Sequence, residues 1–589
     1  MSKVGKTKNS IKETQLSIPD LAKSKKFIFE GEMSKMHKVG ENPQQSDEIM
    51  KAHLARTGKN VITRFAPEPN GFLHIGHAKA MNINFGFSTA YNGKTNLRYD
   101  DTNPEAEQEI YFTAIKDMVE WLGFIPSQTT YSSDNFQKLY ELAVDLIKRD
   151  KAYMCYCTGS EIYQQRGGET NGPRTTCLHR TRHVTESLVE FKKMKDGHFK
   201  QGEATLRMKM DMENPNPQFW DLIAYRVLNI PHIRTGTDWK IYPTYDYSHC
   251  LCDSLEDITH SFCTTEFTLS RPSYYWLIDT LEQYKPVQWE SGRLSIAHTV
   301  LSKRKLNTLV TKGYVYGWDD PRLYTLSALK RRGFTPESVN AFCRELGVTL
   351  ANSIVLPSKL EYYVRDHLNF ISPRLFLVLD PIKITLINLD INFLMNVIVQ
   401  NKPHDESRGV RNMLFTQTVF IARDDFREVP DSNFYRLSLG NIVGLLNIPF
   451  PIRATKVIKN EAGVILEVLA EYLYNFTDKP KAFVQWVANS LKHESPVSIE
   501  VRVIDKLFLH QNPDNKKECP DGWLSDLNPN SLQIVDGFIE LEAKTFKIGN
   551  KFQGVRTGYY CIDPDTTDKK LIVNQIVSLK VKKNDNLLN

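Results

Sequence analysis

Hydrophobic residues begin to recur with regular spacing at residue 59, after a long polar stretch. The run KNVITRF, 59–65, predicts a short strand, and AKAMNINFGFSTAY, 78–91, has the apolar spacing of a buried helix. TNLRYDD, 95–101, predicts a second strand, and helical spacing returns over 105–124 and 135–153. Strands that alternate with helices indicate a parallel, doubly wound sheet.

The pattern changes three times further along the chain. Residues 151–240 are short pieces rich in glycine, proline and charge, which is typical of an inserted domain, and strands and helices alternate again over 240–267. Amphipathic helical segments follow after residue 296, and β-forming residues dominate from 371 onward. The sequence therefore predicts a multidomain protein that is α/β in its first part and all-β in its last.

Residues 1–58 differ from the rest because they are polar and rich in lysine. Residues 1–60 carry 12 Lys and Arg against 7 Asp and Glu, whereas the whole chain has a net charge of +6. We expect a flexible basic extension with a helix near 46–55. Such an extension either contacts a polyanion such as RNA or serves as a solvated tail.

Composition places the chain among globular proteins with several domains. Hydrophobic residues make up 41% and charged residues 24%, and 589 residues exceed what one core usually supports. The nine cysteines do not form the pattern of a disulfide framework, and no apolar run approaches the ~18 residues of a membrane span. We expect a cytoplasmic protein with no membrane partner, although the lysine-rich start leaves an organellar transit peptide open.

The segment ITRFAPEPNGFLHIGHAKA, 62–80, joins the first strand to the first helix through a rigid turn. Pro67 stiffens the approach, and Gly76 lets a ligand come close to the backbone. A helix N-terminus suits phosphate, and His74 and His77 can donate N–H groups to a phosphoryl group there. Zinc is disfavoured because HxxH lacks the acid of HExxH. Two surface histidines on an ordinary helix cap are the plain alternative.

The string PEPNGFLHIGHAK resembles the "HIGH" signature of class I aminoacyl-tRNA synthetases, in their glutamyl and glutaminyl branch. VLSKRKL, 300–306, is similar to the mobile KMSKS loop of the same enzymes. The resemblance continues through RYDDTNP, IYPTYDYSHC, HSFCTTEF, GWDDPR and GYYCID, over roughly residues 60–580. It implies a Rossmann-type catalytic domain with an inserted acceptor-binding domain, a helical connector and two C-terminal anticodon-binding β-barrels.

The resemblance and the pattern together predict five parts. They are a basic flexible N-terminal extension, 1–58; the catalytic domain, 59–150 and 241–295; the acceptor-binding insertion, 151–240; the connector with the KMSKS-like loop, 296–370; and the anticodon-binding barrels, 371–589.

The resemblance also implies which residues bind the substrates. The catalytic groups are His74, His77 and Lys303. Residues that match positions near ATP are Glu68, Pro69, Asn70, His74, Gly76, His77, Thr264, Arg293, Leu294, Leu301, Ser302 and Lys303. Residues that match positions around the amino acid are Arg64, Asp100, Tyr245, Cys263 and Gln288. Arg64 and Asp100 also end adjacent predicted strands, where open α/β sheets bind ligands.

The amino acid is indicated by the residues expected around its side chain. Glutamyl relatives carry an arginine where this chain has Cys263, and a γ-carboxylate buried without a cation is heavily penalised. Tyr245 and Gln288 match positions that contact an amide in glutaminyl relatives, directly or through water. The resemblance therefore implies activation of glutamine with ATP and Mg²⁺, and transfer to tRNA-Gln. A glutamyl enzyme, a catalytically inactive RNA-binding paralogue and a HIGH-bearing nucleotidyltransferase are the alternatives.

Further partners follow from the same resemblance. Arg374, Arg436 and Gln553 match residues that contact the anticodon, and other synthetases in a complex are further expected partners. Gly444 and Leu446 stand where some relatives carry arginines for the first anticodon base, so recognition of that base is expected to differ.

Four residues of the insertion have the spacing of metal ligands. Cys155, Cys157, Cys177 and His179 form C-x-C-x19-C-x-H, two tight pairs that can build a tetrahedral structural zinc site. A similar arrangement occurs in some glutamyl synthetases. Simple burial of reduced cysteines is the alternative.

Overall fold

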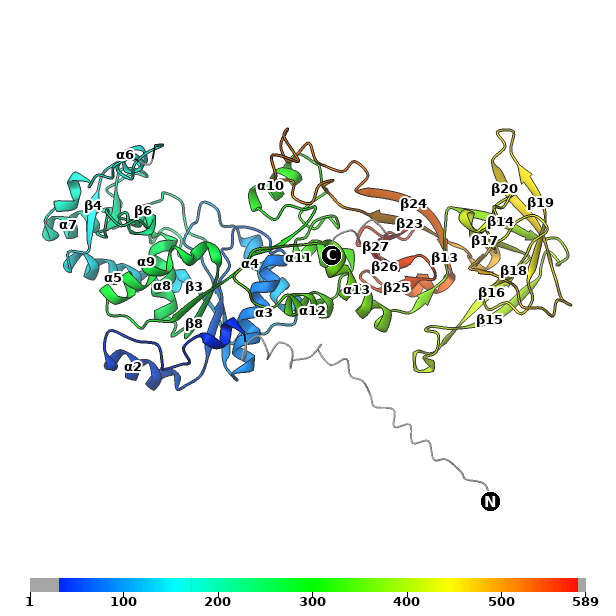
Figure 1. Cartoon of the computed structure of the whole chain (residues 1–589), viewed down its shortest axis with the longest axis horizontal. Coiled ribbons are helices and arrows are strands. Elements are labelled where there is room, and N and C mark those ends of the chain that lie inside the picture. Colours follow the sequence, from blue (N-terminus) through cyan, green and yellow to red (C-terminus); the bar gives the residue numbers. More distant parts are fainter. Residues whose placement is uncertain (1–30, 171, 581–589) are drawn as a thin grey trace, which may run out of the picture. The chain divides into compact units, whose positions relative to one another are not determined.

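The computed structural model describes residues 31–170 and 172–580, and this part of the chain divides into two compact units (Figure 1). The first unit contains the residues up to 295 together with 340–354. The second contains 296–339 and the residues from 355 onward. The finer division into five parts stays a prediction.

A parallel sheet forms the centre of the first unit. Three strands lie in the order β1-β2-β3, and a second parallel pair, β8-β9, lies beside β1 because the N–H of Thr259 donates to the carbonyl of Ile62 at 2.8 Å. The strands are β1 (Ile62–Phe65), β2 (Lys94–Tyr99), β3 (Thr129–Tyr131), β8 (His260–Thr264) and β9 (Val287–Ser291). The carboxyl ends of parallel strands meet at one edge, where side chains from several segments can converge.

The crossover helices begin close to where the apolar spacing predicts them. They are α3 (Ile75–Ala90), α4 (Glu109–Trp121) and α5 (Phe136–Lys148). The helical pattern of 135–153 ends early, because Asp150 adopts a φ of 54° and the chain turns into the next strand at Ala152. The prediction of alternating strands and helices is confirmed, with this shorter third helix.

An antiparallel sheet follows, in the order β4-β5-β6-β7, and its last strand begins just after the predicted insertion of 151–240. Its strands are β4 (Ala152–Cys155), β5 (Thr205–Met208), β6 (Ile223–Val227) and β7 (Ile241–Pro243), and its helices are α6 (Gly159–Gln165) and α7 (Val184–Lys195). The core under this sheet also includes residues of α5, α8 (Tyr245–Leu255) and α9 (Arg271–Thr280). The insertion therefore shares its core with the helices that flank it.

Residues 31–58 differ from the expected flexible extension, because they pack on the first unit. Helix α2 (Asp47–Thr57) confirms the predicted helix, and its buried His53 stacks on Tyr284 with ring centroids 3.5 Å apart. His53 Nδ1 also lies 3.0 Å from Asp257 Oδ1, and Met33 joins a small apolar cluster with residues of α3 and β9. A few buried side chains thus hold this segment against the first unit, although the segment is polar on average. Residues 1–30 lie outside the described part of the chain.

The second unit combines helices with two seven-stranded sheets (Figure 1). Its helices are α10 (Lys303–Thr311), α11 (Leu326–Arg332) and α13 (Pro357–Ile371), while α12 (Pro336–Leu346) runs from residues of the second unit into 340–346 of the first. The short strands β10 (Leu294–Ile296) and β11 (Ser353–Val355) pair with each other.

Each seven-stranded sheet encloses a separate hydrophobic core, which confirms the prediction of barrel-like β domains. The first has the order β12-β25-β26-β27-β23-β24-β13, with bounds β12 (Arg374–Leu375), β25 (Lys551–Gly554), β26 (Gly558–Ile562), β27 (Leu571–Ser578), β23 (Val497–Ile504), β24 (Leu532–Ile539) and β13 (Leu377–Leu379). The second has the order β21-β18-β19-β20-β14-β17-β22, with bounds β21 (Phe483–Val484), β18 (Ile442–Leu445), β19 (Ile452–Lys459), β20 (Ile465–Tyr472), β14 (Pro381–Leu386), β17 (Thr418–Ala422) and β22 (Val487–Ala488). A hairpin of β15 (Leu394–Gln400) and β16 (Val410–Thr416) pairs separately.

Among the described residues, every helix is too short or too polar to cross a bilayer.

The packing of residues 31–58 on the first unit can be tested by a substitution and limited proteolysis. His53→Ala should remove a fully buried ring and its hydrogen bond. The free energy of local unfolding of residues 31–58 should therefore fall by about 2 kcal/mol. Trypsin cleavage after the exposed Lys51 should then accelerate by about tenfold or more in native buffer. His198→Ala, at an exposed histidine, is the control, and equal cleavage rates in the two variants would contradict the packing.

Candidate functional site

The N-terminus of α3 is closed by two histidines that cap each other. His74 Nδ1 accepts the N–H of Gly76 at 3.1 Å, and His77 Nδ1 accepts the N–H of His74 at 3.0 Å. Burial lowers the pKa of His74 well below 6.5, with His77 and Arg293 adding to the shift, and lowers the pKa of His77 to about 4. Both rings are therefore neutral and carry their proton on Nε2, which is left to donate to a ligand.

A second segment approaches the same helix N-terminus. A Cβ on Gly76 would lie 3.7 Å from the carbonyl oxygen of Leu294, so these two residues are close neighbours. Lys79 Nζ donates to the carbonyl of Gly292 at 2.9 Å, which fixes the chain next to Arg293. Arg293 in turn pairs with Glu266 at 2.7 Å. The structure thus brings the predicted nucleotide residues His74, His77, Arg293 and Leu294 together.

The other residues predicted to bind the nucleotide lie beside Arg293, in the turn before α3 and in the second unit. Thr264 Oγ1 donates to Glu266 at 3.3 Å, beside Arg293, and the Asn70 side chain hydrogen-bonds to Glu68 in the turn before α3. Leu301, Ser302 and Lys303 belong to the second unit, where Ser302 is the N-cap residue of α10. Their part in the nucleotide site stays a prediction.

Two carboxylates stand at the carboxyl end of β2. Asp100 Oδ1 accepts from Ser132 Oγ at 3.1 Å, and Asp101 accepts from the N–H and the Oγ of Ser133 at 2.8 and 2.6 Å. Burial raises the pKa of Asp100, although Arg98 and Ser132 oppose the shift. An ammonium group beside Asp100 would favour the charged carboxylate, which suits this residue to an amino-group ligand.

Two further acids next to Asp100 are held partly in their neutral forms. Burial, with a smaller contribution from neighbouring carboxylates, raises the pKa of Asp101 to about 7 and that of Glu107 to about 8. Glu107 Oε1 accepts the N–H of Asn103 at 2.6 Å, whereas its buried Oε2 has no hydrogen-bond partner in the described part of the chain. The RYDD segment therefore ends in a buried acid cluster.

Arg64 on β1 is held by groups that sequence reasoning missed. Its Nε donates to Asp253 Oδ1 at 2.9 Å, and its second terminal nitrogen lies 2.6 Å from His249 Nε2 and 2.9 Å from Ser261 Oγ. Arg98 donates to the same Asp253 oxygen at 2.7 Å. The i, i+4 spacing of His249 and Asp253 in α8 was the available signal, since it places both on one helix face.

The electrostatics of this cluster follow from burial and pairing. Burial alone would raise the pKa of Asp253, but Arg64 and Arg98 hold it well below its usual range. Burial lowers the pKa of His249 to about 3, so this ring is neutral. The positive charge of Arg64 is therefore compensated inside the protein.

The remaining residues predicted around the amino acid gather near Arg64. Cys263 Sγ lies 3.9 Å from an Arg64 nitrogen, and the Tyr245 ring stacks on His249 with centroids 4.8 Å apart. Gln288 is buried on β9; its Nε2 donates to Glu290 at 3.1 Å, and its Oε1 has no partner among the residues described. The residues predicted around the amino-acid side chain, Tyr245, Cys263 and Gln288, are thus polar and uncharged, as an amide ligand requires.

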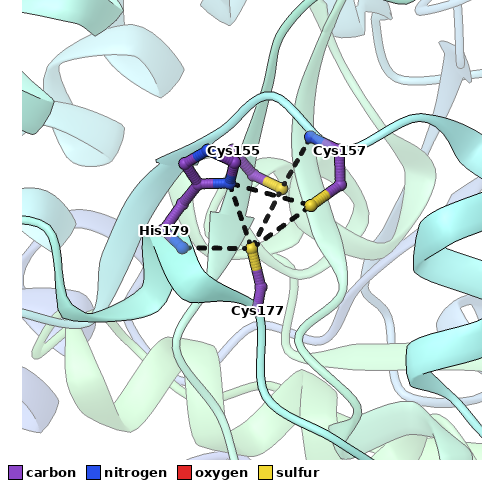
Figure 2. Close-up of side chains that lie close together, drawn as sticks. All are labelled: Cys155, Cys157, Cys177 and His179. Carbon is purple, nitrogen blue, oxygen red and sulfur yellow. Dashed lines mark hydrogen bonds between the residues drawn. The ribbon is translucent and has the colours of Figure 1, made fainter.

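The four predicted metal ligands meet at one point in the insertion (Figure 2). Cys177 Sγ lies 3.6 Å from Cys155 Sγ, 3.4 Å from Cys157 Sγ and 3.2 Å from His179 Nδ1. Ligand atoms at the corners of a zinc tetrahedron are ~3.5 to 3.8 Å apart, so these separations fit the ion. Gln165 Nε2 donates to Cys157 Sγ at 3.3 Å, the kind of outer contact that orients a ligand.

A second group of metal-binding residue types in the described chain, His510, Cys519 and Asp526, has a simpler explanation. His510 Nδ1 lies 2.5 Å from Asp526 Oδ1, which is a hydrogen bond and leaves no room for an ion between the two atoms.

Comparison with protein-family models identifies the family of this chain. Residues 60–370 match the tRNA synthetases class I (E and Q) catalytic domain, and residues 372–473 and 483–563 match two anti-codon binding domains of the same group. The chain belongs to the class I (E and Q) tRNA synthetases. The expected fold class is thereby confirmed.

Two curated relatives and one solved structure give the degree of similarity. A probable glutamine–tRNA ligase of Schizosaccharomyces pombe is 48% identical over 98% of this chain and 75% of its own. The glutamine–tRNA ligase of Saccharomyces cerevisiae is 46% identical over 94% of this chain and 73% of its own. A crystal structure of a glutamate tRNA ligase from Elizabethkingia meningosepticum, in complex with its amino acid, covers 53% of this chain and 70% of that chain at 20% identity, with a TM-score of 0.39.

The predicted tRNA contacts of this synthetase lie in the two β domains. Arg374 and Gln553 are neighbours on the adjacent strands β12 and β25. Arg436 pairs with the buried Asp425 at 2.7 Å, and Arg556 pairs with the same carboxylate at 3.0 Å. Sequence reasoning missed Asp425 and Arg556, because their pairing joins segments that are 131 residues apart.

The structure also explains one departure from the family. A Cβ on Gly444 would lie 2.3 Å from the ring of Phe483, so that ring occupies the space a larger side chain would need. An arginine at this position, as the resemblance implies for some relatives, would require Phe483 to move.

The acid cluster predicts a pH dependence of stability. Because burial raises the pKa of Glu107 from 4.5 to about 8, the folded chain binds this proton more tightly than the unfolded chain does. The free energy of unfolding therefore falls as pH rises from 4.5 toward about 8. Glu107→Gln cannot ionise, so its Tm should exceed that of the wild type at pH 8.5, by on the order of 1 to 3 °C, and much less at pH 5.

The matched control is Glu109→Gln, at an exposed position two residues away. A Tm difference for Glu107→Gln that is the same at both pH values would show that the carboxyl group does not titrate in this range.

Proposed function

We propose that the chain is a glutamine–tRNA ligase that uses ATP to convert L-glutamine to an enzyme-bound adenylate and then transfers it to the 3′ end of tRNA-Gln. Relatives with this name align over 98% and 94% of the chain. The observation that carries the choice of amino acid is the state of Arg64, whose charge is compensated by Asp253 at 2.9 Å and whose neighbour Cys263 is a thiol. A γ-carboxylate would find no uncompensated cation among these groups.

The activation step needs positioning and charge stabilisation, because the glutamine carboxylate is itself the nucleophile at the α-phosphorus. Neutral His74 and His77 donate Nε2–H groups to the phosphates beside the α3 N-terminus. The KMSKS-like loop supplies Lys303 as a further positive charge for the reaction. Mg²⁺ arrives with the nucleotide, as is usual for ATP enzymes.

The amino acid is oriented by residues of the acid and Arg64 clusters. Asp100 accepts the α-ammonium group, and Arg64 helps to orient the carboxylate with its first terminal nitrogen, which donates to the carbonyl of Phe262 at 3.0 Å. Tyr245 and Gln288 contact the side-chain amide. Gln288 Oε1 is buried without a partner in the described chain, so an N–H group of the substrate or a water molecule can satisfy it.

The RNA is held by several parts of the chain. The insertion binds the acceptor end, and Arg374, Arg436 and Gln553 contact the anticodon, with splayed bases held in the β domains. We place this reaction in the cytoplasm.

Charging assays decide the amino acid. The purified chain with ATP, Mg²⁺ and tRNA-Gln should attach glutamine, and glutamate should be attached at least ~100-fold less efficiently in kcat/KM, because a glutamate carboxylate lacks the amide N–H groups and brings an uncompensated charge. Preferred attachment of glutamate would indicate a glutamyl enzyme. Attachment of neither amino acid would indicate an inactive RNA-binding relative.

We also propose that Cys155, Cys157, Cys177 and His179 bind one structural Zn²⁺. The supporting observation is the convergence of three sulfurs and one nitrogen within 4.8 Å of one another (Figure 2). Burial raises the pKa of the Cys155 and Cys177 thiols, so an ion must displace their protons on binding. The ion would hold the segments around β4 and residue 177 together and take no part in the chemistry.

Metal analysis tests this site. The wild type should retain about one Zn²⁺ per chain after dialysis, and Cys177→Ala should retain less than about a tenth of that, with a lower Tm. Cys343→Ala, which changes a buried cysteine outside the group, is the control and should keep the ion. A wild type that loses its zinc in mild dialysis, or a Cys177→Ala that keeps it, contradicts the proposal.

A further inference from the structure

One aromatic side chain of the second seven-stranded sheet is exposed, although the backbone around it is firmly held. Phe483 begins the edge strand β21, and 39% of its surface is accessible to solvent. The strand pairs in parallel with β18, where the N–H of Gly444 donates to the carbonyl of Ala482 at 2.9 Å. The buried Trp486 donates from Nε1 to the carbonyl of Leu446 at 2.9 Å. The position of Phe483 is therefore fixed by the fold, whereas its side chain stays open to solvent.

The Phe483 ring lies over a glycine. A Cβ on Gly444 would be 2.3 Å from both Cδ1 and Cε1 of the ring, so any larger residue at 444 would displace it. Among the described residues, no other aromatic ring and no cationic group packs on Phe483. The glycine thus lets the ring rest against the backbone, and the exposed part of the ring can accept a planar partner.

Positive charge lies on the same face of the sheet. Arg453 on β19 is opposite Ile442 on β18, which is two residues before Gly444. Alternate residues of a strand point to one face, so Arg453 and Phe483 share a face, with their strands about 10 Å apart. Arg453 is partly exposed, and its side chain makes no hydrogen bond or ion pair with any described residue, although Glu471 lies opposite it on β20. Its charge is therefore available to a ligand.

The surroundings of the ring suit single-stranded RNA. Lys481 is exposed two residues before Phe483 and adds a second cation at the approach to β21. Unpaired bases stack on exposed aromatic side chains while neighbouring cations neutralise the phosphates. Residues 372–473 and 483–563 match anti-codon binding domains, so the RNA that this sheet meets is an anticodon loop, whose bases are unpaired.

We propose that the Phe483 ring is the stacking platform for the first anticodon base and that Arg453 neutralises an adjacent phosphate. The first base is assigned because Gly444, beneath the ring, stands where the resemblance implies an arginine for that base in some relatives. The inference rests on the proposed function, since it takes tRNA-Gln as the RNA. Stacking tolerates different bases, so transcripts with U or C at this position should be charged with kcat/KM values within about threefold of each other.

Binding of tRNA-Gln transcripts to the full chain at fixed salt tests the platform. Phe483→Ala should raise the Kd by about 5- to 100-fold, the effect of losing one stacked base, whereas Phe483→Tyr keeps an aromatic face and should stay within about threefold. Leu466→Ala is the matched control, because it removes an exposed apolar side chain from β20 of the same sheet. It should bind the transcript as the wild type does.

A transcript that lacks the base at the first anticodon position identifies the stacked partner. Phe483→Leu still covers Gly444 but offers no aromatic face. It should weaken binding of the intact transcript by about fivefold or more, and binding of the transcript without the first base by less than about twofold. With a transcript that lacks the third anticodon base, the full loss should remain.

The phosphate contact has a separate readout. Arg453→Gln should weaken binding of all these transcripts by a similar factor and reduce the slope of log Kd against log salt concentration by about one. An unchanged slope would contradict the role of Arg453.

The outcomes distinguish the inference from the function beneath it. Phe483 variants that bind the intact transcript as tightly as a wild type that charges glutamine overturn the inference alone. A Phe483→Leu loss that persists with the transcript lacking the first base also overturns it, because the ring would then contact another part of the RNA. A wild type that does not bind tRNA-Gln overturns both the inference and the proposed function.

Discussion

The arrangement of the first unit depends on one buried carboxylate shared between two arginines. Asp253 accepts from Arg64 and Arg98 on the same oxygen, at 2.9 and 2.7 Å, and its other oxygen accepts from Ser261 at 2.7 Å. These groups come from β1, β2, α8 and β8, and all are almost fully buried. Removing one member would leave an uncompensated charge inside the protein, at a cost of about 3 to 5 kcal/mol. The network therefore aligns the strand ends that carry the ligand-binding residues, and it determines how much positive charge Arg64 offers to a ligand.

Local features of the site could be predicted from the sequence, and distant ones could not. His74 and His77 are three residues apart at a helix start, so the mutual cap follows from chain geometry. The four proposed zinc ligands form two pairs in which a single residue separates the members, so only one long-range contact had to be inferred. By contrast, the partners of Arg64 that were missed, His249, Asp253 and Ser261, are 185 to 197 residues away, and the contact of His232 with Asp101 spans 131 residues. No spacing rule connects such residues, and a family resemblance identifies only positions that already have a known role.

The docking of residues 31–58 was missed for a similar reason. Average composition described this segment as solvated, but its place in the structure is set by a few side chains, among them His53 on Tyr284 and Met33 in a small apolar cluster. The surface they cover is formed by Asp257 and Tyr284, which follow α8 and α9, and by residues of α3 and β9, and it exists only in the folded chain. A polar segment can thus be ordered by a minority of its residues, because the free energy of docking depends on the area those residues bury and is unaffected by the segment's mean hydropathy.

The titratable groups around the ligands share one property, which is that burial holds many of them neutral. His74, His77 and His249 have lowered pKa values, whereas Asp101 and Glu107 have raised ones. In the proposed complex, His74 and His77 meet the phosphate as neutral N–H donors, because their Nδ1 atoms already accept backbone N–H groups. An ammonium beside Asp100 favours the ionised forms of the neighbouring acids. Burial thus sets the histidines to donate without charge, whereas the charge that burial suppresses in the acids is restored by the amino acid itself.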